Sequence, residues 1–446
     1  MAAWKLPTDV AFWVANLAGM LDDRNAWRLL PLVVGMLFAR GRRTVSSWLR
    51  GGELGDDYRG YYYFLGSLGR KVNALAGRLL RVAVNVIEPG ECMVFAIDDT
   101  PTKRYGPHVE GTGIHHNPTP GPAGQKFVYG HVWVTLAWVV RHSLWGTIGL
   151  PLLACLYVRQ KDISSIAPWY GIKFETKLEQ ASWLIQWLAG WLKDTGKKLW
   201  VVVDGGYLKH EVIQSAKEAG VTLVGRLRKD AALWTVPETP PPGKRGRGRP
   251  RKYGAQRISL AKRAGHRKGW SRDTFNLYGK IVEVSYKTFL ATYKPARGLV
   301  RVVLVRDDEE QTWRAYMCTD ANATVAQILE AVADRAAIEQ NFHDLKEVHG
   351  VGQQQVRNYW ANIAVYHLAM WLYVLIELWA WRKPARDLVD RSASPWDDAS
   401  RRPSHADRRN ALCGQCIDAA FQLTAAAKGV SRKIKRLWKR LRNYAA

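Results

Sequence analysis

Two apolar segments that each run into a carboxylate constrain the fold most strongly. Met93–Ile97 is an unbroken run of five apolar residues that leads directly into Asp98 and Asp99. Leu199–Val203 repeats this design and leads into Asp204. Short apolar runs with β-branched and aromatic members are typical of buried strands. We therefore predict two neighbouring parallel strands of one sheet, with their acids at the same edge, where such sheets bind ligands.

A third acid lies on a segment with helical spacing. Glu339 follows Arg335 and precedes His343 and Lys346. At 3.6 residues per turn, these side chains fall within roughly 40° of one direction. One face of the predicted helix therefore carries an acid flanked by bases.

Converging carboxylates have a characteristic chemistry. Three such groups cannot all stay ionised without counter-charge, which is why clusters of this kind bind Mg²⁺ or Mn²⁺. Two ions about 4 Å apart activate a water or a 3′-hydroxyl and stabilise the leaving oxygen in an in-line attack on a phosphodiester. We expect Asp98, Asp204 and Glu339 to be the catalytic residues and the metal ligands, with two ions per active site. Asp99 remains an alternative to Asp98 as the first ligand.

These stretches resemble the motifs of DDE transposases with an RNase H-like fold, in the insertion-sequence branch whose third motif reads Y-x2-R-x3-E-x6-K. The matching stretches are Asp98–Thr100, Val202–Gly206 and Arg335–Lys346. The tyrosine position is Val332, and the Lys103–Gly106 continuation suggests a subgroup in which that tyrosine is dispensable. The resemblance covers about residues 30–382, and the three motifs together are far more specific than any one of them.

The resemblance also implies roles for individual residues. The family pattern Asp-x-Thr favours Asp98 as the ligand, with Asp99 supporting it. Arg335 and Lys346 would grip DNA phosphates next to the cut, Arg as a bidentate clamp and Lys as a point charge. The alternative for both is ordinary salt bridging along the helix, for example to Asp334 or Glu330. The DNA contacts expected around the active site are Arg335, His343, Lys346, Thr100, Lys103 and Arg104.

Charge extends the DNA-binding prediction to the rest of the chain. A formal net charge of +27 points to a polyanionic partner and favours nucleic acid over a local membrane patch. A Thr-capped helix that follows Arg42 and Arg43 would enter a DNA groove, with a solvated helix face as the alternative. The segment 244–252 resembles an AT-hook, whose arginines lie in the narrow minor groove, with a solvated linker as the alternative. Its bases are Lys244, Arg245, Arg247, Arg249, Arg251 and Lys252.

The order of the predicted elements indicates an α/β fold. We expect an RNase H-like mixed sheet flanked by helices, interrupted by a mostly β insertion domain, with a helical N-terminal domain and a basic helical C-terminus that includes residues 432–442. Pro101–Lys126 is expected to be a long loop. Asp204 and Glu339 are 135 positions apart, more than the last strand and helix of such a core need, so the insertion is placed between them. The expected parts are 1–90 (helical, DNA-binding), 91–227 (catalytic core, first part), 228–320 (β-rich insertion with the AT-hook-like segment), 321–384 (core, second part) and 385–446 (basic C-terminal region).

Two further features narrow the class of protein. The five cysteines are few and scattered, which favours a reducing compartment, and the lone Cys413-Gly-Gln-Cys416 has only His405 near it, too few ligands for zinc. The apolar run Trp360–Trp381 is long enough to cross a membrane, but it contains His367 and Glu377. We therefore predict a buried helix packed against the sheet and no membrane partner.

Together with the resemblance, these features predict a DNA transposase of the prokaryotic cytoplasm, associated with the nucleoid. It would bind the terminal inverted repeats of its own insertion sequence, nick them and join the 3′ ends to target DNA by cut-and-paste, as a homodimer in the synaptic complex. Two alternatives stay open. One is a non-catalytic, domesticated DNA-binding protein, against which the intact acids argue, and the other is a DNA endonuclease without strand transfer.

Overall fold

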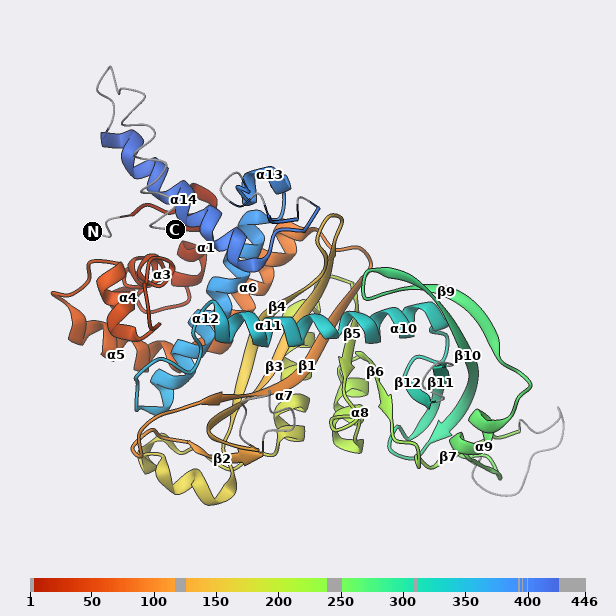
Figure 1. Ribbon diagram of the computed structural model, residues 1–446. Coiled ribbons are helices and arrows are strands. Elements are labelled where there is room, and N and C mark those ends of the chain that lie inside the picture. The colour runs from red at the N-terminus through yellow and green to blue at the C-terminus, as the bar shows by residue number, and fades with distance from the viewer. Residues whose placement is uncertain are drawn as a thin grey trace.

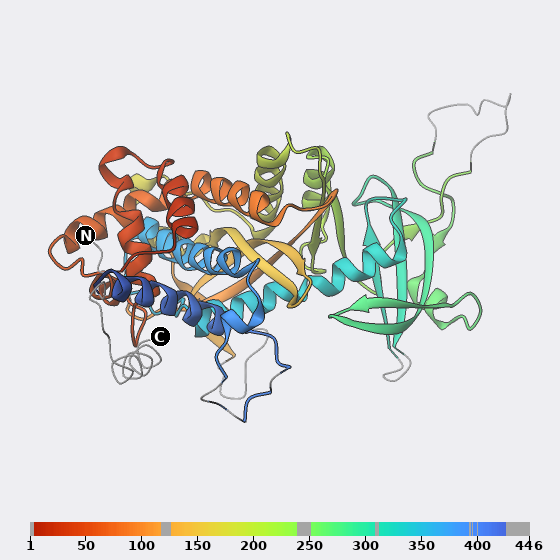
Figure 2. The same ribbon diagram turned by 90° about the horizontal axis from the view of Figure 1, so that it is seen from above.

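The computed structural model describes residues 4–116, 126–238, 251–307, 312–391, 394, 396–398 and 400–424. Over these residues the chain is an α/β protein built on one mixed sheet of twelve strands. The N-terminal helices lie at one end of the molecule and the strands of residues 233–318 at the other (Figures 1 and 2). The predicted fold class, an RNase H-like mixed sheet flanked by helices, is confirmed.

The first 90 residues are helical. Thr44 caps the fourth helix as the sequence predicts, because its Oγ1 accepts a hydrogen bond of 3.2 Å from the Ser47 N–H. Gly35 lets this helix approach its predecessor closely, since a Cβ there would lie 2.1 Å from the Trp48 carbonyl oxygen. The helices are α1 (Thr8–Ala18), α2 (Asp23–Ala26), α3 (Leu29–Leu37), α4 (Val45–Gly51), α5 (Tyr58–Gly69) and α6 (Val72–Ile87).

The centre of the sheet has the strand arrangement of the RNase H-like fold. Its elements are β1 (Cys92–Lys103), β2 (Gly113–His116), β3 (Phe127–His142), β4 (Gly146–Tyr157), two short 3-10 helices (Gln160–Ser165 and Pro168–Tyr170), α7 (Lys177–Leu192), β5 (Lys198–Val203), α8 (His210–Glu218) and β6 (Thr222–Leu227). β1 pairs antiparallel with β3 on one side and parallel with β5 on the other, while β4 pairs with β3 and β6 with β5. The two acid-bearing strands are therefore neighbours, as predicted.

β1 is longer than the sequence predicts. Its parallel pairing with β5 stops at the pair Ile97–Val203, but its antiparallel pairing with β3 continues to Lys103. Asp98 and Asp99 thus lie inside β1 rather than after it, at the edge of the parallel part of the sheet. The expected loop over residues 101–126 is wrong in part for the same reason, because β3 satisfies the backbone of β1 as far as Lys103 and then pairs with β2.

The segment expected as an insertion is β-rich and continues the same sheet. Its elements are β7 (Leu233–Trp234), β8 (Arg257–Ile258), α9 (Leu260–Gly265), β9 (Ser271–Leu277), β10 (Lys280–Tyr293), β11 (Gly298–Asp307) and β12 (Thr312–Cys318). β12 pairs antiparallel with β6, so hydrogen bonds run without a break from the central strands into these outer ones. Lys244, Arg245, Arg247 and Arg249 of the AT-hook-like segment lie outside the described residues.

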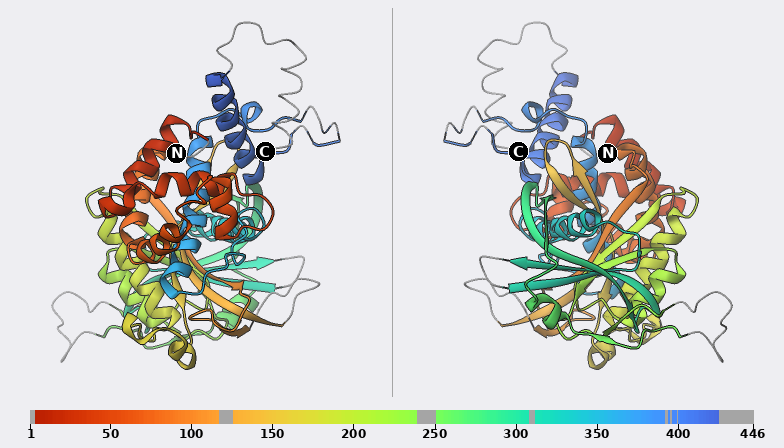
Figure 3. Two further views of the ribbon diagram at one scale, coloured as in Figure 1. Left: turned by 90° about the vertical axis from the view of Figure 1, so that its left-hand side faces the viewer. Right: turned by 90° about the vertical axis from the view of Figure 1, so that its right-hand side faces the viewer.

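In the described part of the chain, five further helices follow the sheet. They are α10 (Val325–Asp334), α11 (Ala336–Glu347), α12 (Tyr359–Ala380), α13 (Ala385–Leu388) and α14 (His405–Thr424). α10 and α11 run one after the other across one face of the sheet (Figure 1). α14 packs against α12 on the side of the N-terminal helices (Figure 3). The basic segment 432–442 lies outside the described residues.

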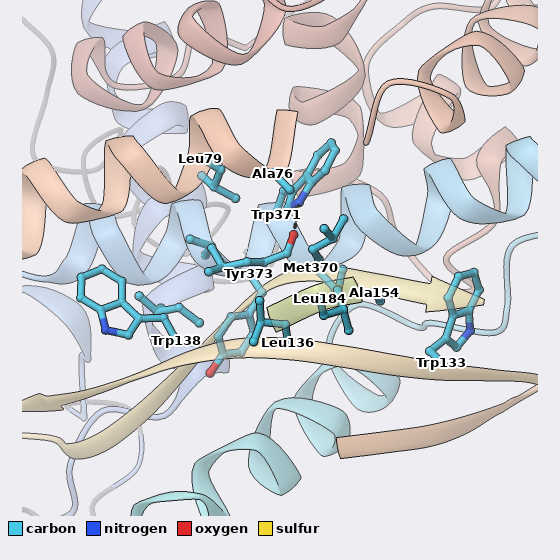
Figure 4. Close-up of a cluster of buried hydrophobic side chains, with 14 of the residues drawn as sticks. Ala76, Leu79, Trp133, Leu136, Trp138, Ala154, Leu184, Met370, Trp371 and Tyr373 are labelled. Atoms are coloured by element: carbon cyan, nitrogen blue, oxygen red, sulfur yellow. Dashed lines mark hydrogen bonds between the residues drawn. The ribbon is translucent and has the colours of Figure 1, made fainter. Parts of the chain in front are cut away.

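α12 is the centre of the hydrophobic core. By length and composition it is the kind of helix that crosses a membrane, yet every residue of its apolar window is buried inside the protein. Met370 and Trp371 pack in the cluster between α6 and the sheet strands (Figure 4), whereas the Tyr373 ring stacks on His405 of α14, with the ring centres 3.9 Å apart. The Trp371 indole N–H donates a hydrogen bond of 2.9 Å to the Leu152 carbonyl oxygen of β4. The predicted buried helix packed against the sheet is confirmed.

Removing the Trp371 side chain should therefore destabilise the whole protein. Trp371→Ala deletes a side chain that is 2% exposed together with its hydrogen bond, so we expect a loss of about 3–5 kcal/mol in the free energy of unfolding. Urea denaturation followed by circular dichroism measures it. Trp396→Ala is the matched control, since that side chain is 83% exposed and its loss should change stability by no more than about 0.5 kcal/mol. Equal stability of the two variants would contradict the placement of α12 in the core.

Candidate active site

Strand alternation turns the two adjacent aspartates of β1 to opposite faces of the sheet. Asp98 lies on the face of Ala96, against which Ile338 and Phe342 of α11 pack. Asp99 lies on the other face, towards α7. The neighbouring acids of the sequence therefore have different surroundings.

Asp98 is held by a guanidinium and a backbone amide. Its Oδ2 accepts a hydrogen bond of 2.6 Å from Arg335 Nη1, and its Oδ1 accepts one of 2.8 Å from the Asp99 N–H. The side chain is only 19% exposed. Burial raises the pKa of Asp98 to about 6, against the opposing effect of Arg335 and with further increases from Asp204 and Asp99. This carboxylate is therefore poised to gain from another positive charge.

Arg335 joins two of the three predicted acids. It lies between α10 and α11, and its Nη2 is 3.2 Å from Oε1 of Glu339, one helical turn further along. The guanidinium thus lies between Asp98 and Glu339. The alternative partners considered from the sequence, Glu330 and Asp334, are instead paired with Arg141 at 2.9 and 2.7 Å.

Asp204 follows β5 and is oriented by its own turn. Its Oδ1 accepts hydrogen bonds of 2.8 Å from the Gly206 N–H and 3.1 Å from the Tyr207 N–H. The parallel pairing of Ile97 with Val203 sets this residue beside Asp98 at the same sheet edge. The Gly-Gly that follows Asp204 in the sequence serves this tight turn.

Asp99 has two partners that the sequence did not reveal. Lys177 at the start of α7 lies 2.6 Å from its Oδ2, and the Tyr207 hydroxyl donates a hydrogen bond of 2.7 Å to its Oδ1. Burial, followed by the charge of Asp99, raises the pKa of Tyr207 and keeps the phenol protonated. The position of Tyr207 directly after the Asp-Gly-Gly turn was the one sequence signal that placed this side chain near the acids. Lys177 carries no such signal.

The donor atoms at this edge suit a hard divalent cation, because carboxylate oxygens are the ligands that Mg²⁺ and Mn²⁺ prefer. Among the residues that the structure describes, no three His, Cys, Asp or Glu side chains are already close enough together to hold a metal ion. Arg335 provides the physical reason, since it supplies the positive charge between Asp98 and Glu339. The chemistry of the acids fits the expected ions. In this structure Asp98 and Glu339 are spaced as two carboxylates that share the Arg335 guanidinium.

The remaining predicted DNA contacts differ in exposure. His343 is 65% exposed and touches Asp344, whereas Lys346 is half-buried and burial lowers its pKa. Thr100, also predicted as a DNA contact, is only 4% exposed. Lys103, Arg42, Arg251 and Lys252 are exposed, Arg43 is half-buried, and Arg104 is buried. Val332, at the tyrosine position, packs against the apolar cluster under α10.

A second group of titratable side chains lies away from this edge, between α12 and α14. His405 bonds to Glu377 at 2.6 Å through Nδ1 and to Nε2 of His349 at 2.8 Å through Nε2, and Arg408 also bonds to Glu377 at 2.9 Å. Cys413 and Cys416 are free thiols buried in α14. His405 therefore serves this buried ion network, which fastens α14 to the core.

Comparison with known families agrees with this geometry. The family model described as DDE superfamily endonuclease matches residues 16–274, more than half of the chain. The chain belongs to the DDE superfamily of endonucleases. A second family model, transposase DDE domain, matches residues 181–375 of this DDE protein. The search of curated proteins gave no significant match. Membership in the DDE family makes the protein a nuclease of the transposase type, which acts on DNA and uses divalent metal ions.

Proposed function

We propose that this DDE enzyme is the transposase of an insertion sequence. It would cut DNA at the terminal inverted repeats of its own element and join the 3′ ends to target DNA by cut-and-paste. The observation that carries the proposal is the meeting of Asp98 and Asp204 at the edge of the parallel strands β1 and β5, with Glu339 facing Asp98 across Arg335. The matches to the endonuclease and transposase families support it.

Asp98, Asp204 and Glu339 are proposed as the catalytic acids that hold two Mg²⁺ or Mn²⁺ ions. When bound, such ions supply activation of a water or 3′-hydroxyl and stabilisation of the leaving oxygen. Asp98 is preferred over Asp99 because it lies on the face of the sheet where Arg335 also contacts Glu339, whereas Asp99 lies on the opposite face and pairs with Lys177 of α7. Asp99 and Tyr207 would then support the position of the strand edge.

The basic residues of α11 are proposed to bind the DNA next to the cut. Arg335 now neutralises Asp98 and Glu339, and its guanidinium becomes available to a phosphate when cations take over those carboxylates. Lys346 is half-buried, so a phosphate that reaches it would meet a weakly hydrated ammonium. His343 is exposed on the same helix.

We further propose the division of labour expected from the sequence. Residues 1–90 and the β-rich residues 228–320 would add DNA contacts on either side of the core formed by 91–227 and 321–384, and residues 385–446 would contribute a basic C-terminal region. The arrangement of the N-terminal helices and the outer strands at opposite ends of the sheet supports two separate DNA contacts (Figure 2). The enzyme would act as a homodimer on paired ends, at the nucleoid in the prokaryotic cytoplasm. A monomer by light scattering on end DNA would contradict the dimer.

Substitution of the acids tests the catalytic assignment. Asp98→Asn, Asp204→Asn and Glu339→Gln should each lower the Mg²⁺-dependent nicking rate by at least about 10²–10³-fold, since each removes charge that stabilises the transition state. Binding to end DNA should remain nearly intact. Asp99→Asn is the matched control, because its side chain faces Lys177, and it should keep nicking within about tenfold of wild type.

Nicking at the wild-type rate by Glu339→Gln, or an active Asp98→Asn protein beside an inactive Asp99→Asn protein, would contradict the assignment. Loss of end binding in all variants would favour a purely structural role for the acids. Nicking without any joined product would favour the endonuclease alternative. DNA binding with no nicking by the wild-type chain would favour the non-catalytic alternative.

The raised pKa of Asp98 predicts how metal affinity depends on pH. Protons and divalent cations compete for this carboxylate, so Mg²⁺ or Mn²⁺ affinity should be constant well above pH 6 and fall by up to about tenfold per pH unit below the pKa of about 6. Titration calorimetry between pH 5 and 8 measures it. Asp98→Asn should bind metal weakly with no such inflection. An unchanged inflection in that variant would show that another group governs metal binding.

A further inference from the structure

A polar pocket lies where three distant segments of the chain meet. It is formed by Arg42 before α4, by the residues that follow β1, and by residues 352–357 between α11 and α12, and it encloses about 370 Å³. The described residues that line it include no Asp or Glu. The lining residues with hydrogen-bonding side chains are Arg42, Arg104, Tyr105, His108, Gln353, Gln354, Gln355 and Arg357.

Arg104 is the unusual member of this lining. It is 4% exposed, and it donates hydrogen bonds of 3.1 Å from Nε to His131 Nδ1 and 2.9 Å from Nη1 to the Gln354 carbonyl oxygen. Its Nη2 is buried and has no hydrogen-bond partner among the described residues. Burial lowers the pKa of Arg104 to about 10. A buried cation with an unused donor costs free energy until an anion meets it.

The groups around Arg104 cannot supply that anion. His131 is fully buried, and burial, reinforced by the charge of Arg104, lowers its pKa so that the ring stays neutral. Its Nε2 bonds to the Glu110 carbonyl oxygen at 2.9 Å, and the Glu110 carboxylate accepts the Tyr359 N–H at 2.6 Å. Among the described residues, the hydrogen-bond partners of the guanidinium are therefore neutral, and Arg104 also lines the pocket.

The pocket is held in shape by a braced turn. Gly352 has φ of 98°, and a Cβ there would lie 2.9 Å from the Lys103 carbonyl oxygen, so only glycine lets the turn press against β1. The Gln354 side chain accepts the Gly352 N–H at 3.0 Å and donates to the Gly350 carbonyl oxygen at 3.1 Å. Gln353 accepts the Arg43 N–H at 2.8 Å, which ties the turn to the N-terminal helices. These contacts thus fix the turn that forms one wall of the pocket.

The mouth of the pocket is basic and aromatic. Arg42 and Arg357 are exposed there, and the Arg42 guanidinium lies 5.4 Å from the centre of the Tyr105 ring, which is itself 67% exposed. Two exposed guanidinium groups thus lie in front of a buried one. This arrangement suits a polyanion, because one of its singly charged groups can enter the pocket while its neighbouring groups contact the outer arginines.

We propose that this pocket binds one backbone phosphate of the DNA end, with the Arg104 guanidinium as its buried cation and Arg42 and Arg357 at its mouth. The proposal rests on the transposase function proposed above and adds a fixed anchoring point to it. Arg104 follows Asp98 by six residues on β1 and its continuation, and at about 3.3 Å per residue this is roughly 20 Å from the active-site edge. The anchored phosphate therefore lies within about six base pairs of the cut.

Methylphosphonate scanning tests the anchor. Duplexes selected from a random-sequence pool by the full-length wild-type chain would carry one neutral methylphosphonate at each backbone position in turn, and binding to Asp204→Asn protein would be measured without divalent metal. One or two positions should weaken binding by about tenfold. Adding Arg104→Gln should abolish the effect at those positions and leave the rest of the profile unchanged.

A second variant decides the matter if Arg104→Gln fails to fold. Arg42→Ala/Arg357→Ala changes only exposed side chains and should reduce sensitivity at the same positions, whereas Arg386→Ala, with a side chain 87% exposed on α13, should leave the profile as it was. An unchanged profile in the pocket variants of a chain that still binds and cuts the duplex would overturn the anchor alone. A wild-type chain that neither binds nor cuts DNA would instead overturn the proposed function.

Discussion

A buried carboxylate needs a positive neighbour, and the proposed active site of this DDE protein depends on how that need is met at Asp98. Burial under α11 raises the pKa of this group to about 6. Arg335 forms an ion pair of 2.6 Å with Asp98, and the same guanidinium also contacts Glu339. Arg335 lies between α10 and α11. Its ion pair with Asp98 therefore also helps to position α11, the helix that carries Glu339.

β1 organises most of the charged chemistry of the molecule. Its alternation sends Asp98 to Arg335 on one face and Asp99 to Lys177 on the other, so each adjacent acid has its own cation. Just beyond the strand, Arg104 presents the reverse case, a buried cation with no carboxylate partner among the described residues. The acids within β1 are thus paired with cations, whereas the arginine that follows the strand has no such counter-charge among the described residues.

Local pattern was enough to predict several parts of this structure. The apolar runs before Asp98 and Asp204 identified two paired parallel strands, and the apolar length of α12, interrupted by His367 and Glu377, identified a buried helix. Both predictions rest on burial, which a sequence records directly in the spacing of its apolar residues.

Contacts between distant segments could not be read in the same way. The antiparallel pairing that carries β1 on to Lys103, and that of β12 with β6, depends on partners that local sequence does not specify. The pairing of Arg335 with Asp98 spans 237 positions, and nothing in the helix sequence distinguishes it from a bridge to Asp334. The assignment of the acids themselves came from family resemblance as much as from the strands.

The central claim is that Asp98, Asp204 and Glu339 converge on divalent cations when Arg335 releases its acids. Iron-mediated affinity cleavage tests it directly: Fe²⁺ replaces Mg²⁺, and ascorbate with peroxide then cuts the polypeptide backbone next to the bound ion. We expect fragments that end near residues 98, 204 and 339, suppressed by excess Mg²⁺ and absent from Asp204→Asn protein. Cleavage instead near His405 and Cys413, or at none of the three segments, would contradict it.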